Sequence, residues 1–209
     1  MNRIIAIDGP TASGKGTLAK GVAKFYNLPY LNTGALYRAI ALHLLENSLE
    51  NFTDENEVVE AAPNADFSDL DSPRLYTEEV SSLTSKIAVI PGVRKFLYDF
   101  QVNFANQEGG TVLDGRDIGT VICPHASYKF FVTATVEKRA ERRYRQRQRL
   151  SKDKNVDYNE ILNNLIERDR RDSGRAEAPL KKADDAIEID TTDMGVAETV
   201  DYVLSLIKF

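Results

Sequence analysis

A glycine-rich segment between two apolar patterns constrains the fold of this chain more than any other feature. Residues 9–17 read GPTASGKGT, directly after the apolar run 4–8 and directly before an apolar-periodic segment at 18–25. This order predicts the strand, glycine loop and helix of a P-loop. Gly9 and Gly14 let the backbone wrap, so that successive N–H groups can bind a polyphosphate at a helix N-terminus. A glycine-rich turn without a ligand is the alternative, and the flanking patterns disfavour it.

Lys15 and Thr17 supply the charged and metal-binding groups of this loop. The lysine adds a mobile cation for the outer phosphates, and the threonine hydroxyl lies near the metal that accompanies them. Gly16 separates the two residues, whereas in the commonest P-loop a Ser or Thr follows the lysine at once. This GKGT variant favours nucleoside monophosphate kinases.

Length and composition indicate one folded domain in a reducing compartment. The 209 residues suffice for an α/β domain with inserted segments. The single cysteine, Cys123, excludes an internal disulfide and is interpreted as a packing residue. His43 and His125 lack neighbours at ligand spacing, so a histidine metal site is not expected. No apolar run approaches the roughly 20 residues of a membrane span, and no leader precedes the first strand. We expect a cytoplasmic monomer that binds no membrane.

Charge is distributed unevenly along the chain. The net charge is −5, yet residues 136–175 carry 13 Lys and Arg against 8 Asp and Glu. The rest of the chain has 14 basic against 24 acidic residues. Because that acidic remainder would repel a phosphate polymer, the pattern favours a small anion held in a pocket over nucleic acid.

Apolar segments bounded by turn residues predict five strands, at residues 3–8, 29–32, 111–114, 128–133 and 186–190. Helical patterns lie between them. Two helices show apolar residues at the 3.6-residue period, namely Val93, Phe96, Leu97, Phe100 and Phe104, and Val196, Val200, Val203, Leu204 and Ile207. We predict the α/β three-layer fold of P-loop NTPases, with a five-stranded parallel sheet in the order 2-3-1-4-5 and ligands at the carboxyl ends of its strands.

Two segments depart from the core pattern of this single domain, 1–209. Residues 46–80 hold eleven acidic residues against one base, Arg74, and belong to a predicted insertion at about 46–90. Residues 150–175 are strongly polar, with a short apolar pattern, and are predicted to form a mobile lid. The core then comprises residues 1–45, 91–149 and 176–209. The apolar residues of the lid are Ile161, Leu162, Leu165 and Ile166.

Arginines follow several of the predicted strands. A planar guanidinium suits phosphate because it donates two parallel hydrogen bonds and keeps its charge. We expect these side chains to converge at one edge of the sheet, and scattered surface arginines are the alternative. The set comprises Arg38, Arg116, Arg139, Arg143, Arg168, Arg171 and Arg175. Asp114, which ends the third strand, is either a Walker B carboxylate that holds magnesium through water or a structural turn cap.

Five motifs occur in order along the chain: GPTASGKGT at 9–17, NTGALYR at 32–38, IPGVR at 90–94, DGRDIGTVICP at 114–124 and ERDRRDSGRAEAPL at 167–180. In this content and order the chain resembles the cytidylate kinase family, the bacterial CMP and dCMP kinases, over nearly its whole length. The resemblance implies ATP-dependent phosphorylation of CMP and dCMP to CDP and dCDP, with Mg²⁺ bound alongside ATP. It also makes 46–90 the NMP-binding insertion.

The resemblance implies a role for each matching residue. ATP would contact Gly9, Pro10, Thr11, Ala12, Ser13, Gly14, Lys15, Gly16, Thr17 and Arg139. The CMP phosphate would contact Thr33, Arg38 and Arg116, its cytosine Ser85, Arg94 and Asp117, its ribose Arg168 and Asp172, and Arg175 would serve the same site. The catalytic residues would be Lys15, Arg116, Arg139, Arg143 and Arg171. Thr17 and Asp114 would hold the metal.

Two features depart from the family pattern. Asn32 stands where the family usually has Asp, and the segment around 62–85 is shorter than in many relatives and lacks an obvious β-hairpin.

The acceptor phosphate, with a second pKa of about 6, is already mostly dianionic at neutral pH. Direct in-line transfer therefore needs no catalytic His or Cys.

Three other functions compete with this one. Another P-loop kinase, acting on UMP, AMP or a metabolite hydroxyl, should lack the DGRD and R-x-x-APL stretches. A GTP-dependent switch would need an Asn-Lys-x-Asp motif, and residues 181–184 read KKAD. A nucleic-acid-binding module would use the basic lid and show a steep salt dependence.

Overall fold

Parallel strands form the central layer of the molecule. In this computed structural model, which describes residues 3–150 and 156–208, five strands make one sheet in the order β2-β3-β1-β4-β5. Their bounds are Ile4–Asp8 for β1, Tyr30–Asn32 for β2, Thr111–Gly115 for β3, Tyr128–Thr133 for β4 and Ile187–Asp190 for β5. All four pairings are parallel, which confirms the predicted fold class and strand order.

Side chains of β1 alternate between two hydrophobic cores. Ile4 and Ala6 point into a core beneath one face of the sheet, and Ile5 and Ile7 point into a second core on the opposite face. This period of two is the geometry of a strand, and burial on both faces explains why the sequence here is continuously apolar. The central strand therefore needs helices on both sides.

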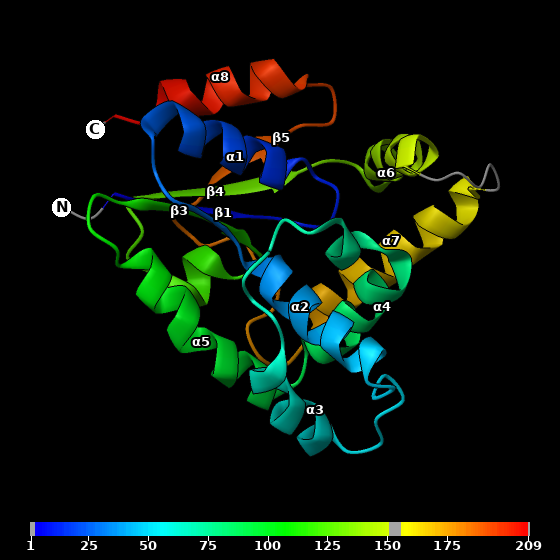
Figure 1. Cartoon of the computed structure of the whole chain (residues 1–209). Helices are drawn as coiled ribbons and strands as arrows, with labels where there is room; N and C mark the ends of the chain where they lie inside the picture. The colour runs from blue at the N-terminus through cyan, green and yellow to red at the C-terminus, as the bar shows by residue number, and fades with distance from the viewer. Residues whose placement is uncertain (1–2, 151–155, 209) are drawn as a thin grey trace.

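Helices cover both faces of the sheet (Figure 1). On one face lie α1, Lys15–Tyr26, and α8, Val196–Leu206. On the other lie α2, Thr33–Glu46, and α5, Pro91–Ala105. Helix α1 starts directly after the loop because Gly14 takes a left-handed conformation, with φ of 93°, which only glycine adopts without strain.

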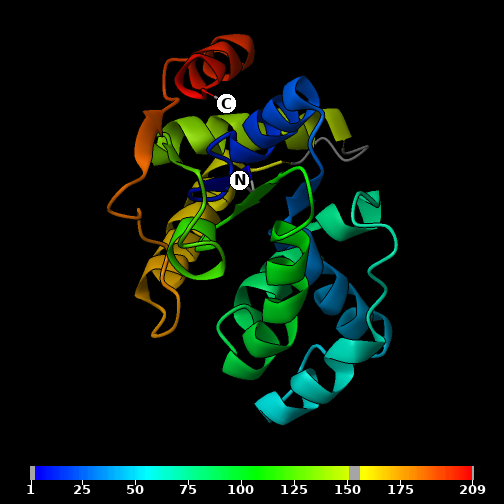
Figure 2. The same cartoon turned by 90° about the vertical axis from the view of Figure 1, so that its left-hand side faces the viewer.

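The predicted insertion, 46–90, is helical throughout its regular parts. Figure 2 shows it extending away from the end of the molecule that carries α8. Its elements are α3, Glu55–Ala61, the short 3₁₀ turns η1, Ala62–Asn64, and η2, Pro73–Tyr76, and α4, Glu78–Ile87. All of these residues are described and none forms a strand, in line with the missing hairpin signal.

The predicted lid contains helix α7, which packs against helix α6. Helix α6 spans Val136–Leu150, and α7 spans Tyr158–Gly174. Ala140 of α6 forms a small buried cluster with Ile161 and Leu165 of α7. Residues 151–155, which also belong to the predicted lid, lie outside the described residues. The mobility of the lid and the division into core, insertion and lid stay predictions.

Parts of the predicted apolar stripes are wrong. Phe96 and Phe100 of α5 are 39% and 44% exposed, and both rings contact Phe67 of the insertion at 6.3 Å between centroids. The buried face of α5 instead carries Val93, Arg94, Leu97, Gln101 and Ala105. Polar side chains can take core positions here because each finds a partner, which the apolar pattern alone does not reveal. Val196 and Ile166 are likewise exposed.

Among the described residues, no helix has the length and apolar character to cross a bilayer.

Candidate active site

A large cleft opens at the carboxyl ends of the strands. Its volume is about 1230 Å³, which exceeds the roughly 300–1,000 Å³ of most single-ligand pockets. The walls come from the P-loop, the β2–α2 junction, the insertion, the segment after β3, and helices α5, α6 and α7. Most of the residues predicted for the site line it, and most of the predicted arginines converge there as expected. The predicted residues outside the lining are Gly9, Pro10, Ser13, Arg139 and Arg171.

Packing requires a glycine at position 9 of the P-loop. A Cβ atom on Gly9 would lie 2.0 Å from the Val132 carbonyl oxygen, so no side chain fits there. Lys15, whose side chain is buried, reaches back to the Pro10 carbonyl at 3.3 Å. Burial, followed by repulsion from Arg116, lowers the pKa of Lys15 to about 7. The loop thus holds a cation that an incoming anion would stabilise.

Asp114 faces this loop from the neighbouring strand. The Tyr30 hydroxyl donates to its carboxylate at 2.6 Å, and a Cβ on Gly16 would lie 3.7 Å from the second carboxylate oxygen. Asp114 lies within β3, which continues to Gly115, so it is not a turn cap. Burial raises the pKa of Asp114 against the opposing effects of Lys15 and the Tyr30 hydrogen bond.

Oxygen donors suitable for magnesium are present here. Mg²⁺ prefers one or two carboxylates or hydroxyls together with phosphate oxygens and water. Thr17 and Asp114 both line the cleft beside the loop, which fits that donor set. Among residues 3–150 and 156–208, no three His, Cys, Asp or Glu side chains gather as a ready-made metal cluster.

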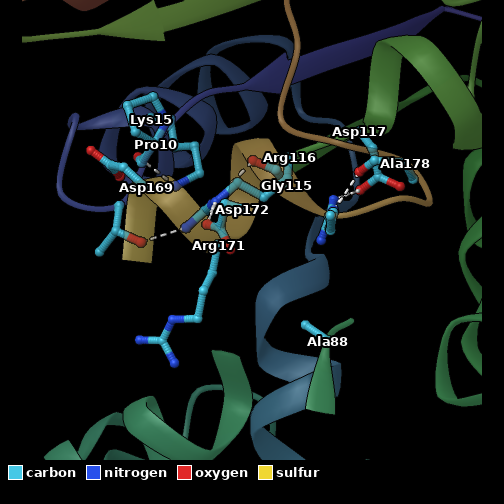
Figure 3. Close-up of polar contacts among 12 residues, drawn as sticks. Pro10, Lys15, Ala88, Gly115, Arg116, Asp117, Asp169, Arg171, Asp172 and Ala178 are labelled. Atoms are coloured by element: carbon cyan, nitrogen blue, oxygen red, sulfur yellow. Dashed lines mark hydrogen bonds and ion pairs between the residues drawn. The ribbon is translucent and has the colours of Figure 1, made fainter. Parts of the chain in front are cut away.

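Arg116 bridges the loop and helix α7 in the middle of the cleft. Its guanidinium donates to the Thr11 hydroxyl at 2.5 Å and to the Asp172 carboxylate at 2.9 Å. Figure 3 shows Arg116 and Asp172 facing one another, while the Arg171 guanidinium extends away from them. Attraction by Arg116 and Arg168 lowers the pKa of Asp172 despite its burial. The arrangement links the predicted lid to the P-loop.

Charged groups buried at the far end of the cleft form a compact polar cluster. Arg94 of α5 donates to the Asp117 carboxylate, and both side chains are about nine-tenths buried. Arg175 lies 3.5 Å from the other carboxylate oxygen of Asp117. The buried hydroxyl of Ser85, which also lines the cleft, has no hydrogen-bond partner among the described residues. A buried donor without a partner is suited to a polar ligand.

Cationic side chains also line the wall between the two ends. Arg38 donates to the Ser81 hydroxyl at 2.7 Å and lies over the Tyr76 ring at 5.1 Å. Burial, followed by repulsion from Arg116, lowers the pKa of Arg168 to about 9, so this side chain remains charged at neutral pH. Arg143 lies on the same wall. The Thr33 hydroxyl donates a hydrogen bond to the Asp114 carbonyl oxygen at 2.9 Å.

Two of the predicted arginines, Arg139 and Arg171, do not line the cleft. Arg139 is buried and donates to Ala134, Thr11 and Asp169, and it is not among the residues that line the cleft. Its predicted contact with adenine stays a prediction that this arrangement does not favour. Arg171 lines only a smaller adjoining pocket of about 270 Å³.

Other residues that contact the loop were not predicted. Arg142 donates to the Ser13 carbonyl at 3.3 Å and to the Thr191 hydroxyl at 2.9 Å. Its spacing of three residues from Arg139 was the available signal, because residues three apart share a helix face. Asn32, which replaces the usual Asp, donates to the Tyr76 hydroxyl at 3.5 Å. Asp8, which was not among the predicted site residues, accepts two backbone hydrogen bonds beside the site.

The fold and the glycine loop place the chain in the P-loop class of nucleotide-binding proteins. A solved structure of an uncharacterized protein from Eubacterium ventriosum matches the fold with a TM-score of 0.55 at 19% identity, covering 99% of this chain and 98% of that one. The family model described as cytidylate kinase matches residues 5–209. The chain belongs to the cytidylate kinase family.

Curated relatives match at nearly full length. A cytidylate kinase of Xanthobacter autotrophicus is 48% identical over 98% of this chain and 97% of its own length. One of Bartonella tribocorum is 45% identical, with coverage of 98% and 94%. One of Fusobacterium nucleatum is 43% identical, with coverage of 99% and 98%.

Proposed function

We propose that the chain transfers the terminal phosphoryl group of ATP to CMP and dCMP, giving CDP and dCDP. The observation that carries this proposal is a single cleft with the P-loop cation Lys15 at one end and the buried Arg94–Asp117 cluster at the other. Family membership supports the same reaction. The volume of the cleft, about 1230 Å³, suits two nucleotides placed end to end.

The acceptor would be recognised by groups that are already oriented. Cytosine presents an amine donor beside two acceptors, so it can use the Asp117 carboxylate, the Arg94 guanidinium and the Ser85 hydroxyl. A purine or uracil would leave some of these buried groups without partners, which is costly. The phosphate would lie beside Thr33, Arg38 and Arg116. Arg168 and Asp172, the latter held by Arg116, would face the ribose.

The donor phosphates would lie in the P-loop beside Lys15. Backbone N–H groups of the loop would bind them, and Arg143 would face the transferring group from α6. The acceptor phosphate, with a second pKa of about 6, is itself the nucleophile, so the residues align the two groups and stabilise equatorial charge. Thr17 and Asp114 would hold Mg²⁺, which neutralises phosphate charge when bound.

The alternative is a kinase of the same class with UMP or AMP as acceptor. A coupled assay of ADP release across CMP, dCMP, UMP, AMP and GMP separates the two. We expect CMP and dCMP to give the highest kcat/KM, with AMP and GMP lower by roughly a hundredfold or more because they leave the Arg94–Asp117 cluster unpaired. Comparable rates with AMP or GMP would contradict the assignment of that cluster to cytosine.

The proposed partners are small molecules. The acidic charge of the chain outside residues 136–175 opposes a nucleic-acid polymer, and the buried single cysteine suits the reducing cytoplasm. We propose a cytoplasmic monomer. Light scattering of the purified chain with and without nucleotides would test the monomeric state.

A further inference from the structure

The side chain of Asp8 lies where the P-loop and the segment after β3 meet. Asp8 is the last residue of β1 and directly precedes Gly9. In the parallel register it faces Gly115, which directly precedes Arg116. Its side chain is only 5% exposed. One buried carboxylate therefore adjoins both the segment that would bind the donor and the segment that would bind the acceptor.

Both oxygens of this carboxylate hold the backbone of that second segment. The Ile118 N–H donates to one oxygen at 2.9 Å, and the Gly119 N–H donates to the other at 2.8 Å. These residues begin the one-turn π-helix η3, Ile118–Ile122, directly after Arg116 and Asp117. Packing is close, since a Cβ on Gly119 would lie 3.4 Å from the carboxylate. Two charge-assisted hydrogen bonds thus fix the turn that carries both acceptor-site residues.

We propose that Asp8 is a positioning residue that aims Arg116 and Asp117 at the acceptor nucleotide. It reaches no substrate itself, and it acts by holding the backbone of residues 118 and 119 against the end of β1. This inference rests on the proposed acceptor site, and it adds Asp8 as a residue that positions the site without touching the nucleotide.

The charge state of Asp8 decides how well it can hold the turn. Burial raises the pKa of Asp8 to about 7, against the two backbone hydrogen bonds that lower it. Asp117 and Arg116 face it from the segment after β3, and Cys123 faces it from the end of η3. Lys129 of β4 packs beside Gly119 but directs its ammonium to Asp185. The ionised carboxylate accepts both hydrogen bonds, whereas a protonated one has a donor in place of one acceptor.

The variant Asp8→Asn tests the proposal, because its amide offers one acceptor and one donor. We would measure the binding of CMP and of ATP separately by calorimetry at pH 8. The Kd for CMP should rise about tenfold, as expected for a lost hydrogen bond to a charged group, and the Kd for ATP should change less than about twofold. Asp201→Asn is the control, since it removes an exposed carboxylate on α8 and leaves residues 118 and 119 and their neighbour Lys129 unchanged. It should bind both nucleotides normally.

The pH dependence separates positioning from a purely structural role. The ratio of the CMP Kd in Asp8→Asn to that in the unmodified protein should fall from about tenfold at pH 8 to about twofold at pH 6, because protonation of Asp8 removes one acceptor there too. The CMP phosphate, with a second pKa of about 6, titrates with both proteins and cancels in the ratio.

Each outcome has a distinct meaning. An unchanged Kd for CMP, or equal losses for CMP and ATP, would overturn the positioning role of Asp8. If Asp8→Asn does not fold, the unmodified protein and cytidine, which carries no phosphate, provide the test: affinity should weaken as pH falls from 8 to 6, and a flat profile would overturn the inference. Failure of the unmodified protein to bind CMP while it binds ATP would instead overturn the proposed function, and this inference with it.

Discussion

The two ends of the cleft are built in different ways. The donor end is one contiguous loop, residues 9–17, in which backbone N–H groups and Lys15 are suited to bind an anion. The acceptor end is assembled from α5, the segment after β3 and the residues after α7, and its Asp117 carboxylate already pairs with both Arg94 and Arg175. The donor end therefore recognises charge that any triphosphate brings. The acceptor end, where Asp117 already has arginine partners, recognises a hydrogen-bonding pattern.

This contrast also predicts where binding free energy is used. Burial lowers the pKa of Lys15 against the attraction of Asp114, so phosphate binding at Lys15 should relieve a desolvation penalty present in the free protein. A buried and paired arginine gains little from added charge but loses much if its partner is removed. Substitutions at the donor end should mainly change kcat, and those at the acceptor end should mainly change the KM for CMP.

The largest effect is expected from Lys15→Met. Removing the cation beside the transferring group should lower kcat by about a thousandfold, the range seen when one group that stabilises transition-state charge is lost. CMP binding should persist, because the acceptor cluster is untouched. Steady-state kinetics and CMP calorimetry would measure both, with Lys24→Met, an exposed lysine on the same helix, as the control. Near-normal turnover by Lys15→Met would remove the lysine from the mechanism.

A smaller and more selective effect is expected from Asp117→Asn. It leaves Arg94 and Arg175 without their carboxylate, so kcat/KM for CMP should fall roughly 10- to 100-fold while the KM for ATP changes less than about twofold. Asp201→Asn, on the exposed side of α8, is the control. Thermal unfolding must accompany the kinetics, since breaking a buried ion pair also destabilises the fold. Equal changes in the KM for CMP and the KM for ATP would contradict the proposed difference between the donor and acceptor ends of the cleft.

Contiguous features were predictable from the sequence. The P-loop and the strands follow from glycine positions and apolar runs, which are local signals, and strand order followed from the fold class they indicate. The alternation of Ile4 and Ala6 with Ile5 and Ile7 then needed only the period of a strand. For the same reason the donor end was the more predictable half of the site.

Pairings between distant residues could not be predicted in this way. Arg94 meets Asp117 across 23 residues and Arg116 meets Asp172 across 56, and only the tertiary fold brings them together. Arg139 illustrates the limit: periodicity places it on the same helix face as Arg143, yet its guanidinium turns inward to Asp169. Asp8 was missed because an acidic residue at a strand end is read as the end of the strand rather than as an anchor.

The smallest effect we predict is the pH dependence of ATP binding, which tests the charge state of Lys15 at the donor end. Burial and Arg116 lower the pKa of Lys15 to about 7 in the free protein, and bound phosphates should raise it again. Binding then requires the protonated form, so ATP affinity should weaken as pH rises above about 7, by roughly tenfold between pH 7 and pH 8.5. Calorimetry in two buffers of different ionisation enthalpy should show proton uptake on binding. Lys15→Arg, whose guanidinium stays charged, should bind ATP without that uptake. Parallel pH profiles for the two proteins would mean that the lysine is already protonated before ATP arrives. The contrast between Lys15, which forms no ion pair within the described residues, and the paired acceptor end would then lose its electrostatic basis.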